Sequence, residues 1–256
     1  MARMEVEQGR CLAVSKDGRW IAAGMEYKGV VVWNAKTYER AFPGKGGRGG
    51  VDFSPDATRL VSTDRWAGAI IWDVASGKQA QTLHHKDAKG SCPDMVAVKY
   101  SPQGDRIATA SGHSVQVWDS NDGRLLMKIN IDDLQYRSVN LHWRNDHLFV
   151  VSNGQIQQFS ASTGSKISEW LVPNVDYYPC FALSQHGGFI ACSTEHSVTF
   201  WDTATRTQLS LTQYPHGIRS IALSPDNRFF ATVPRGLGGK ITIQSLSHVA
   251  VSIRLV

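Results

Sequence analysis

The chain offers few residues at the spacing that catalysis or nucleotide binding would need. A phosphate-binding loop follows the pattern G-x-x-x-x-G-K-[ST]. The stretch Pro43–Gly50 (PGKGGRGG) has glycines and basic side chains, but it lacks that spacing and has no Ser or Thr after its lysine. We interpret it as a flexible connecting loop, the alternative being a basic loop in which Lys45 and Arg48 touch an anionic partner.

Metal binding has no matching pattern either. Zinc sites need clustered Cys and His residues, and the nearest cluster is His84 and His85, followed by Cys92. Adjacent histidines on a loop cannot easily share one metal ion, so we expect them to be solvated. The stretch His142–His147 (HWRNDH) differs from H-E-x-x-H and crosses a predicted turn. We predict no metal and no other cofactor.

Nucleophilic and acid–base chemistry is equally unsupported. The chain has no G-x-S-x-G, and no spacing pairs a nucleophile with a base. Asp132 and Asp133 form its only adjacent acidic pair, and consecutive residues of a strand point to opposite faces. We therefore predict no catalytic residues and expect that the protein is not an enzyme. A hydrolase with a site in a central channel is the weaker alternative.

The composition is that of a folded, mildly basic protein. Hydrophobic residues make up 42% of its 256 residues and charged residues 19%. A net charge of +5 permits an acidic partner without requiring one. The cysteines show no C-x-x-C pair, so we expect free thiols in a reducing compartment, with a Cys180–Cys192 disulfide as the disfavoured alternative. They are Cys11, Cys92, Cys180 and Cys192.

The first ten residues are polar, and the longest apolar runs are far shorter than a membrane span. We expect no signal peptide and no membrane insertion. The expected location is intracellular and cytoplasmic, with a nuclear location left open.

Six copies of one unit fill the chain, and two features locate them. The first is a Ser-Pro-Asp-like turn between two apolar strands, as in VDFSPDATRLVS, at intervals of 39 to 47 residues. Its serines are Ser15, Ser54, Ser101, Ser184 and Ser224, and Arg144 takes the serine position in the fourth copy.

The second feature is a Trp-Asp-like pair at the end of a strand, at intervals of 39 to 46 residues. It stands at Trp33-Asn34, Trp72-Asp73, Trp118-Asp119, Phe159-Ser160, Trp201-Asp202 and Gln244-Ser245. The two features recur at nearly the same intervals along the chain, which indicates a true internal repeat.

Each unit contains four short strands separated by turns, here called a to d, and no segment shows a helical apolar stripe. A four-stranded meander of about 40 residues cannot bury its own faces, whereas copies arranged radially can. The units resemble WD-repeat β-propellers, and the resemblance spans Cys11 to Val256.

This resemblance implies an all-β propeller of about six four-stranded antiparallel blades in a single domain of residues 1–256. A seven-bladed relative and a truncated ring are the alternatives. The units cover about residues 9–44, 45–84, 92–132, 136–172, 176–213 and 216–256.

Ring closure is left open by the sequence. The stretch Val249–Val256 supplies a fourth strand to the sixth unit, and Met4–Gln8 resembles the trailing strand of a missing blade. Either the ring closes at six blades without an interlocking strand, or the chain is a piece of a longer propeller. A looser resemblance, carried by VDFSPDATRLVS and KYSPQGDRIATA, is to the degenerate WD-repeat regions of fungal NACHT-type proteins. It implies a sensing or scaffolding part.

Members of this family often link a Gly-His pair, a turn Asp, a Ser or Thr on strand b and the Trp of strand c by hydrogen bonds. This chain keeps the Trp in four units and little else, so we expect packing to hold the blades. We expect Trp118 to pack against the next blade. The residues predicted for the inter-blade core are Trp33, Trp72, Trp118 and Trp201.

The architecture also predicts a binding surface, because the d–a and b–c loops of every blade emerge on one face and rigid scaffolds commonly bind through such loops. The candidates are aromatic and charged residues of the types enriched in interface hot spots. Packing between blades is the alternative for each, above all for Trp66. They are Tyr27, Lys28, Arg65, Trp66, His113, Tyr136, Arg137, Tyr178, His196, Tyr214 and Arg235.

The predicted function is a non-catalytic scaffold for a protein or peptide partner, with an acidic segment favoured by the net charge. It would act as a monomer or in a larger complex, or as the sensor of a larger signalling protein. A nucleic-acid or anionic-surface module is the alternative, although the arginines that stand near aromatic residues are scattered over several units.

Overall fold

The computed structural model describes residues 9–25, 29–44, 50–64, 68–84, 95–111, 114–131, 139–152, 154–173, 180–184, 187–194, 196–224, 226–235 and 241–246. Within these ranges the chain forms β-strands joined by short turns and contains no α-helix. The all-β prediction is therefore confirmed. No helix in the described ranges is long and apolar enough to span a membrane.

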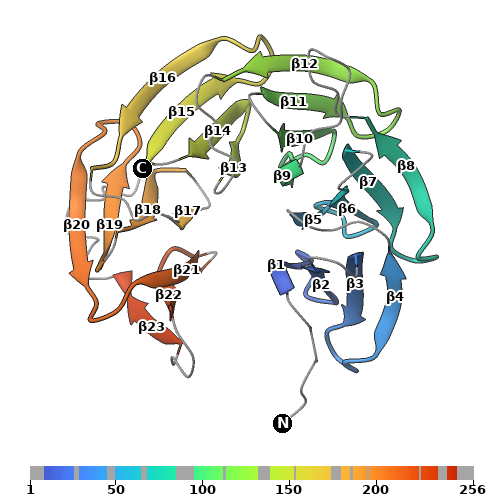
Figure 1. The fold of residues 1–256 in the computed structure, drawn as a ribbon, viewed down its shortest axis with the longest axis horizontal. Helices are drawn as coiled ribbons and strands as arrows, with labels where there is room; N and C mark the ends of the chain where they lie inside the picture. Colours follow the sequence, from blue (N-terminus) through green and yellow to red (C-terminus); the bar gives the residue numbers. More distant parts are fainter. Residues whose placement is uncertain are drawn as a thin grey trace. The chain divides into compact units, whose positions relative to one another are not determined.

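The strands form six antiparallel sheets, each a meander in chain order (Figure 1). Five sheets have four strands, and the last has three within the described residues. These sheets are the blades of a six-bladed β-propeller, which confirms the predicted fold class. They are numbered 1 to 6 in chain order. The predicted strands at Met4–Gln8 and Val249–Val256 lie outside the described residues.

Blades 1 to 3 consist of β1 (Gly9–Val14), β2 (Trp20–Met25), β3 (Gly29–Asn34) and β4 (Arg40–Gly44); β5 (Val51–Phe53), β6 (Arg59–Asp64), β7 (Gly68–Asp73) and β8 (Gln79–Leu83); and β9 (Met95–Tyr100), β10 (Arg106–Ser111), β11 (Ser114–Asp119) and β12 (Leu125–Asn130). Blades 4 to 6 consist of β13 (Val139–Arg144), β14 (His147–Ser152), β15 (Gln155–Ser160) and β16 (Lys166–Leu171); β17 (Phe181–Leu183), β18 (Phe189–Ser193), β19 (Ser197–Asp202) and β20 (Gln208–Gln213); and β21 (Ile218–Leu223), β22 (Phe229–Pro234) and β23 (Thr242–Ser245).

The chain divides into two compact units. The first comprises Met1–Leu148 and Ser160–Ser165, and the second comprises Phe149–Phe159 and Lys166–Val256. Strands β1 to β12 lie wholly in the first unit, and strands β17 to β23 lie wholly in the second.

The repeated serine closes the turn between strands a and b. In blade 2, the Ser54 hydroxyl donates to Asp56 Oδ1 (2.6 Å) and accepts a hydrogen bond from the Arg59 backbone N–H (2.9 Å). The turn therefore satisfies polar groups at the point where the strands separate, as side chains of this type do in tight turns. The same backbone bond is accepted by Ser15, Ser101, Ser184 and Ser224.

The Asp of the Trp-Asp pair caps the turn between strands c and d. Asp119 Oδ1 accepts from the Asn121 N–H (2.8 Å), and Gly123 ends the turn with a left-handed φ of 69°. The Asp of the pair therefore has a structural use in this turn. The equivalent positions with positive φ are Tyr38, Gly77, Gly164 and Arg206.

Trp72, Trp118 and Trp201 lie between blades, as predicted. Trp33 packs, within the described residues, only against side chains of its own blade, such as Met25 and Val31. Trp72 is 5% exposed and belongs to a core with Val30 and Val32 of blade 1. Trp118 shares a core with Val61 of blade 2, so the expectation that it packs against the next blade is wrong. Alternation along strand c places the Trp on one face of its sheet, and the stacking of the sheets sets the preceding blade against that face.

The polar links of the family survive better than the sequence indicated. Trp72 Nε1 donates to Ser62 Oγ (2.9 Å) on strand b, and Trp118 Nε1 donates to Thr109 Oγ1 (2.8 Å). The expectation that little besides the Trp is kept is therefore wrong for blades 2 and 3. A buried indole N–H needs an acceptor, which explains why these two links are present.

Three cysteines lie in the described ranges, and all are free thiols: Cys11, Cys180 and Cys192. The disfavoured disulfide between Cys180 and Cys192 is absent, which confirms the expectation for this pair. Cys180 Sγ instead lies 2.6 Å from the Arg219 carbonyl oxygen. Burial raises the pKa of Cys11 to about 11 and also raises that of Cys192, so both favour the unreactive thiol form. Cys92 lies outside the described residues.

Candidate functional site

Three of the predicted contact residues can be placed, and all three lie in the second unit. The Tyr214 N–H donates to the His196 carbonyl (2.7 Å), and the Arg235 N–H donates to the Gly217 carbonyl (2.7 Å). The backbone thus ties the b–c loops of blades 5 and 6 to the d–a loop between them. The other eight lie outside the described residues: Tyr27, Lys28, Arg65, Trp66, His113, Tyr136, Arg137 and Tyr178.

These three side chains differ in their surroundings. His196 is exposed, whereas Tyr214 is half-buried and packs against the apolar core shared by blades 5 and 6. The Tyr214 hydroxyl donates to Gln244 Oε1 (2.8 Å), and burial raises its pKa. Tyr214 therefore supports the surface that His196 and Arg235 border, and we call these three residues the loop surface.

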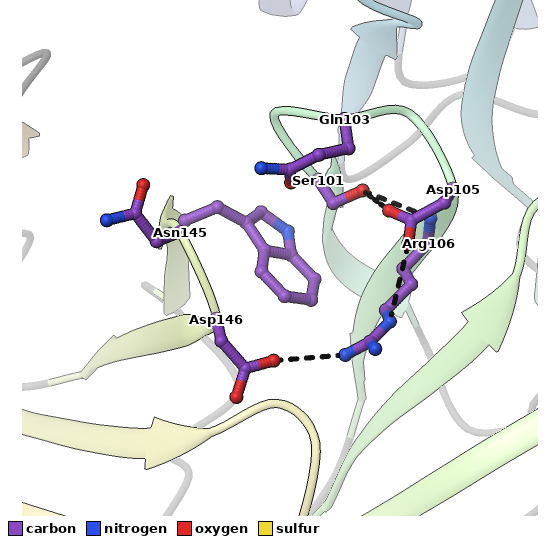
Figure 2. A pocket seen from close by; sticks show the side chains of 7 residues that line it. Ser101, Gln103, Asp105, Arg106, Asn145 and Asp146 are labelled. Atoms are coloured by element: carbon purple, nitrogen blue, oxygen red, sulfur yellow. Dashed lines mark hydrogen bonds and ion pairs between the residues drawn. The ribbon is translucent and has the colours of Figure 1, made fainter.

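A pocket that the sequence did not predict lies in the first unit, between the a–b turns of blades 3 and 4 (Figure 2). It has a volume of about 300 Å³. In each blade, these turns stand at the opposite strand ends from the b–c loops. The lining residues are Ser101, Gln103, Asp105, Arg106, Trp143, Asn145 and Asp146.

The pocket borders the short a–b turn of blade 4. Four residues separate Ser101 from Arg106 in blade 3, but only two separate Arg144 from His147 in blade 4. The tip of this short turn is Asn145, whose φ of 50° is left-handed, a conformation that Asn tolerates. The shorter turn leaves space beside blade 3, and this difference in length was the available sequence signal.

One guanidinium joins the two blades at the pocket. Arg106 Nη1 donates to Asp146 Oδ1 (3.2 Å) and to the Ala161 carbonyl (2.9 Å), while its Nε lies 3.7 Å from Asp105 Oδ2 (Figure 2). Arg59 donates in the same way to the Ser120 carbonyl (2.7 Å) between blades 2 and 3. This arginine contact is therefore a repeated structural feature.

The two carboxylates of the pocket differ in how fully they are bonded. Asp146 Oδ2 accepts from the Ser162 hydroxyl (2.7 Å) and backbone N–H (3.2 Å) and from the Ser160 hydroxyl (3.2 Å). Desolvation opposes ionisation, but these bonds and Arg106 outweigh it and lower the pKa of Asp146. Asp105 accepts from Ser101 Oγ (2.7 Å) through Oδ1 and is half exposed.

An indole borders the pocket. Trp143 Nε1 donates to the Lys99 carbonyl (3.3 Å), which holds the ring in place, and the side chain is half-buried. The equivalent residue of blade 3 is Tyr100, which is 4% exposed. The open junction thus carries the larger and more exposed aromatic ring.

Comparison with known proteins agrees with this architecture. The family model "WD domain, G-beta repeat" matches residues 8–34 and 77–119. These two segments of the chain are WD repeats. Relatives of the chain include WD repeat-containing protein 1 of Mus musculus, 25% identical over 54% of this chain, and small ribosomal subunit protein RACK1 of Drosophila melanogaster, 32% identical over 27% of it. These matches cover 23% and 20% of the two relatives' lengths.

The lining of the pocket is polar and aromatic. Its one hydroxyl, that of Ser101, is bonded to Asp105 and to the Arg106 N–H, and no His or Cys stands among its lining residues. In the described ranges, no group of three or more His, Cys, Asp or Glu could hold a metal ion. What the pocket offers is an aromatic ring, two amides and a partly bonded carboxylate.

Proposed function

We propose that this WD-repeat protein is a non-catalytic scaffold that binds a protein or peptide partner through the loop surface. WD-repeat propellers serve in general as protein-interaction scaffolds, so the family supports the role, while the partner and the face are our own assignment. The observation that carries it is the backbone link from His196 through the 214–217 loop to Arg235. These two hydrogen bonds fix the backbone at His196, Tyr214 and Arg235 before any partner binds, which lowers the entropic cost of binding.

An acidic segment is the partner we propose for this surface. The chain carries a net charge of +5, and Arg235 and His196 border the loop surface. Complementary charge speeds association and selects partners, and salt screens it. In a longer signalling protein, the same surface would act as the sensing part.

A displayed library of random peptides tests this function. We expect the selected peptides to be rich in Asp and Glu, with affinity that falls as salt rises. Arg235→Glu should weaken their binding about tenfold, because it reverses a charge at the surface. The matched control is Arg228→Glu, which changes an arginine that is 74% exposed in the a–b turn of blade 6.

Two results would refute the proposal. One is a library that yields no binding peptide, and the other is equal weakening by Arg235→Glu and Arg228→Glu. A single-stranded oligonucleotide that binds more tightly than every selected peptide, with a steep salt dependence, would support the nucleic-acid alternative instead. Thermal unfolding of each variant shows whether the substitution has altered the fold.

A further inference from the structure

We propose that the pocket between blades 3 and 4 binds an arginine side chain presented by a partner peptide. This site shares no residue with the loop surface and would give the scaffold a second docking point. The inference rests on the charge of the pocket, on its aromatic ring and on its size.

The charge of the pocket favours a cation. Its lining contains two carboxylates, Asp105 and Asp146, and one guanidinium, Arg106, so its formal charge is −1 although the whole chain is at +5. Arg106 already donates to Asp146 and to the Ala161 carbonyl and lies beside Asp105. An anion would have to compete with both carboxylates for this arginine.

One carboxylate retains capacity for a ligand. Asp146 accepts bonds from Arg106, Ser160 and Ser162. Asp105 has its Oδ1 bonded to Ser101, while its Oδ2 lies 3.7 Å from the Arg106 Nε, beyond hydrogen-bond distance. The Asp105 side chain is 56% exposed, so this oxygen is the acceptor we assign to the incoming guanidinium.

The remaining walls suit a flat, donor-rich group. The Trp143 indole is held by its bond to the Lys99 carbonyl, and a guanidinium stacks well on such a ring. Gln103 and Asn145 add amide oxygens that can accept, and an arginine carries five N–H donors in one plane. A volume of about 300 Å³ is at the small end for ligand pockets and fits one side chain better than a folded segment.

The test titrates the whole chain with a short peptide that carries one arginine, and follows the Trp143 indole N–H by NMR. Trp143→Phe assigns that signal by removing it. Two matched peptides carry citrulline, which has the same shape without the charge, or lysine, which lacks the planar fork. We expect the arginine peptide to shift the signal, the citrulline peptide to bind at least tenfold more weakly, and lysine to fall between them.

Two variants place the ligand in the pocket. Asp105→Asn should weaken arginine binding at least fivefold, because it removes the charge while keeping an oxygen for Ser101 to donate to. The matched control is Asp122→Asn, which neutralises a carboxylate that is 61% exposed in the c–d turn of blade 3 and should have no effect. Gln103→Glu should strengthen binding about threefold, which gives a readout if Asp105→Asn does not fold.

The proposal fails if citrulline and arginine bind equally or if the Trp143 signal does not move at millimolar peptide. It also fails if inorganic phosphate moves that signal while arginine does not, because the site would then take anions. Arg235→Glu should leave arginine binding unchanged. Failure of the loop surface and failure of this pocket can therefore be told apart.

Discussion

The junction between blades 2 and 3 and the junction between blades 3 and 4 share an arginine contact, but a pocket lies at the second. Between blades 2 and 3, Tyr100 is buried beside Arg59, and Gly104 lies close to Pro55 of blade 2. Between blades 3 and 4, the equivalent ring of Trp143 is half exposed beside a pocket. The arginine contact is present at both junctions. Turn length therefore decides whether such a junction is closed or open.

The inner strands show a second difference between these junctions. Asp52 accepts from Lys99 Nζ (2.6 Å) and from the Tyr100 N–H (2.8 Å), so blades 2 and 3 are joined by a satisfied polar contact. The equivalent residue of blade 4 is His142, whose Nε2 is buried without a hydrogen-bond partner within the described residues. His142 therefore lacks the polar contact that Asp52 makes.

The largest expected effect comes from removing the aromatic ring at each junction. Tyr100→Ala should lower the free energy of unfolding by about 3–5 kcal/mol, because it leaves a cavity in a closed core. Trp143→Ala should cost only about 1–2 kcal/mol, since its ring is already half exposed. Urea unfolding of both variants measures the two values.

Tyr100→Phe is the control for this pair. Among the residues that the structure describes, the buried Tyr100 hydroxyl has no hydrogen-bond partner, so its removal should be neutral or stabilising. Equal losses for Tyr100→Ala and Trp143→Ala would show that the two junctions are packed alike and would contradict the comparison.

The second effect concerns the pH dependence of stability at His142. Burial, with a smaller contribution from Lys99, lowers the pKa of His142 to about 4 from its ordinary value of 6.5. Because the folded state holds His142 neutral, its contribution to stability is complete above pH 6.5 and is lost as the pH falls toward 4. The wild type should lose a few kcal/mol of unfolding free energy over this window, and His142→Leu should abolish that loss.

Urea midpoints at pH 7 and pH 4.5 measure this difference. The control is His216→Leu, which changes an exposed histidine and should keep the wild-type decline. If His142→Leu and the wild type lose stability by the same amount, His142 is not held neutral by its burial.

The smallest effect tests the contact that closes the junction of blades 2 and 3. Gly104 has a φ of +78°, and an added Cβ would lie 3.0 Å from Pro55 Cδ. Gly18 is its equivalent in blade 1, with a φ of +71° and no described atom within 4 Å of an added Cβ. Both Gly→Ala changes should cost about 1–2 kcal/mol for the left-handed backbone, and Gly104→Ala should cost more. Equal decreases in melting temperature for Gly104→Ala and Gly18→Ala would mean that Pro55 moves aside without loss of stability.

The repeat made most of the fold predictable. Ser54 and Trp72 stand at fixed points of a recurring unit, and the local physics of a turn serine and a buried indole is the same in every copy. The direction of Trp packing was not predictable in this way. Alternation along a strand assigns Trp118 to one face of the sheet, but which blade covers that face depends on how the sheets stack.

The pocket was missed for a different reason. In the sequence, the fourth unit is identified by Arg144 in the serine position, and the short distance from Arg144 to His147 belongs to no motif. The pocket exists because the a–b turn of blade 4 is shorter than that of blade 3, whereas sequence motifs are recognised by the residues that are present. Comparing the lengths of equivalent turns across the six units would have pointed to the junction beside Asn145, although not to the bonding of Asp105 and Arg106.

The direction in which the Trp side chains pack also bears on protein synthesis. Trp72 completes a core with blade 1, and Trp118 completes one with blade 2. The N-terminal part of a chain leaves the ribosome first and can fold first. When blade 2 or blade 3 is synthesised, the blade that covers its Trp side chain has therefore already been made. The indole can be buried without a segment that is synthesised later. Translation order and packing order coincide.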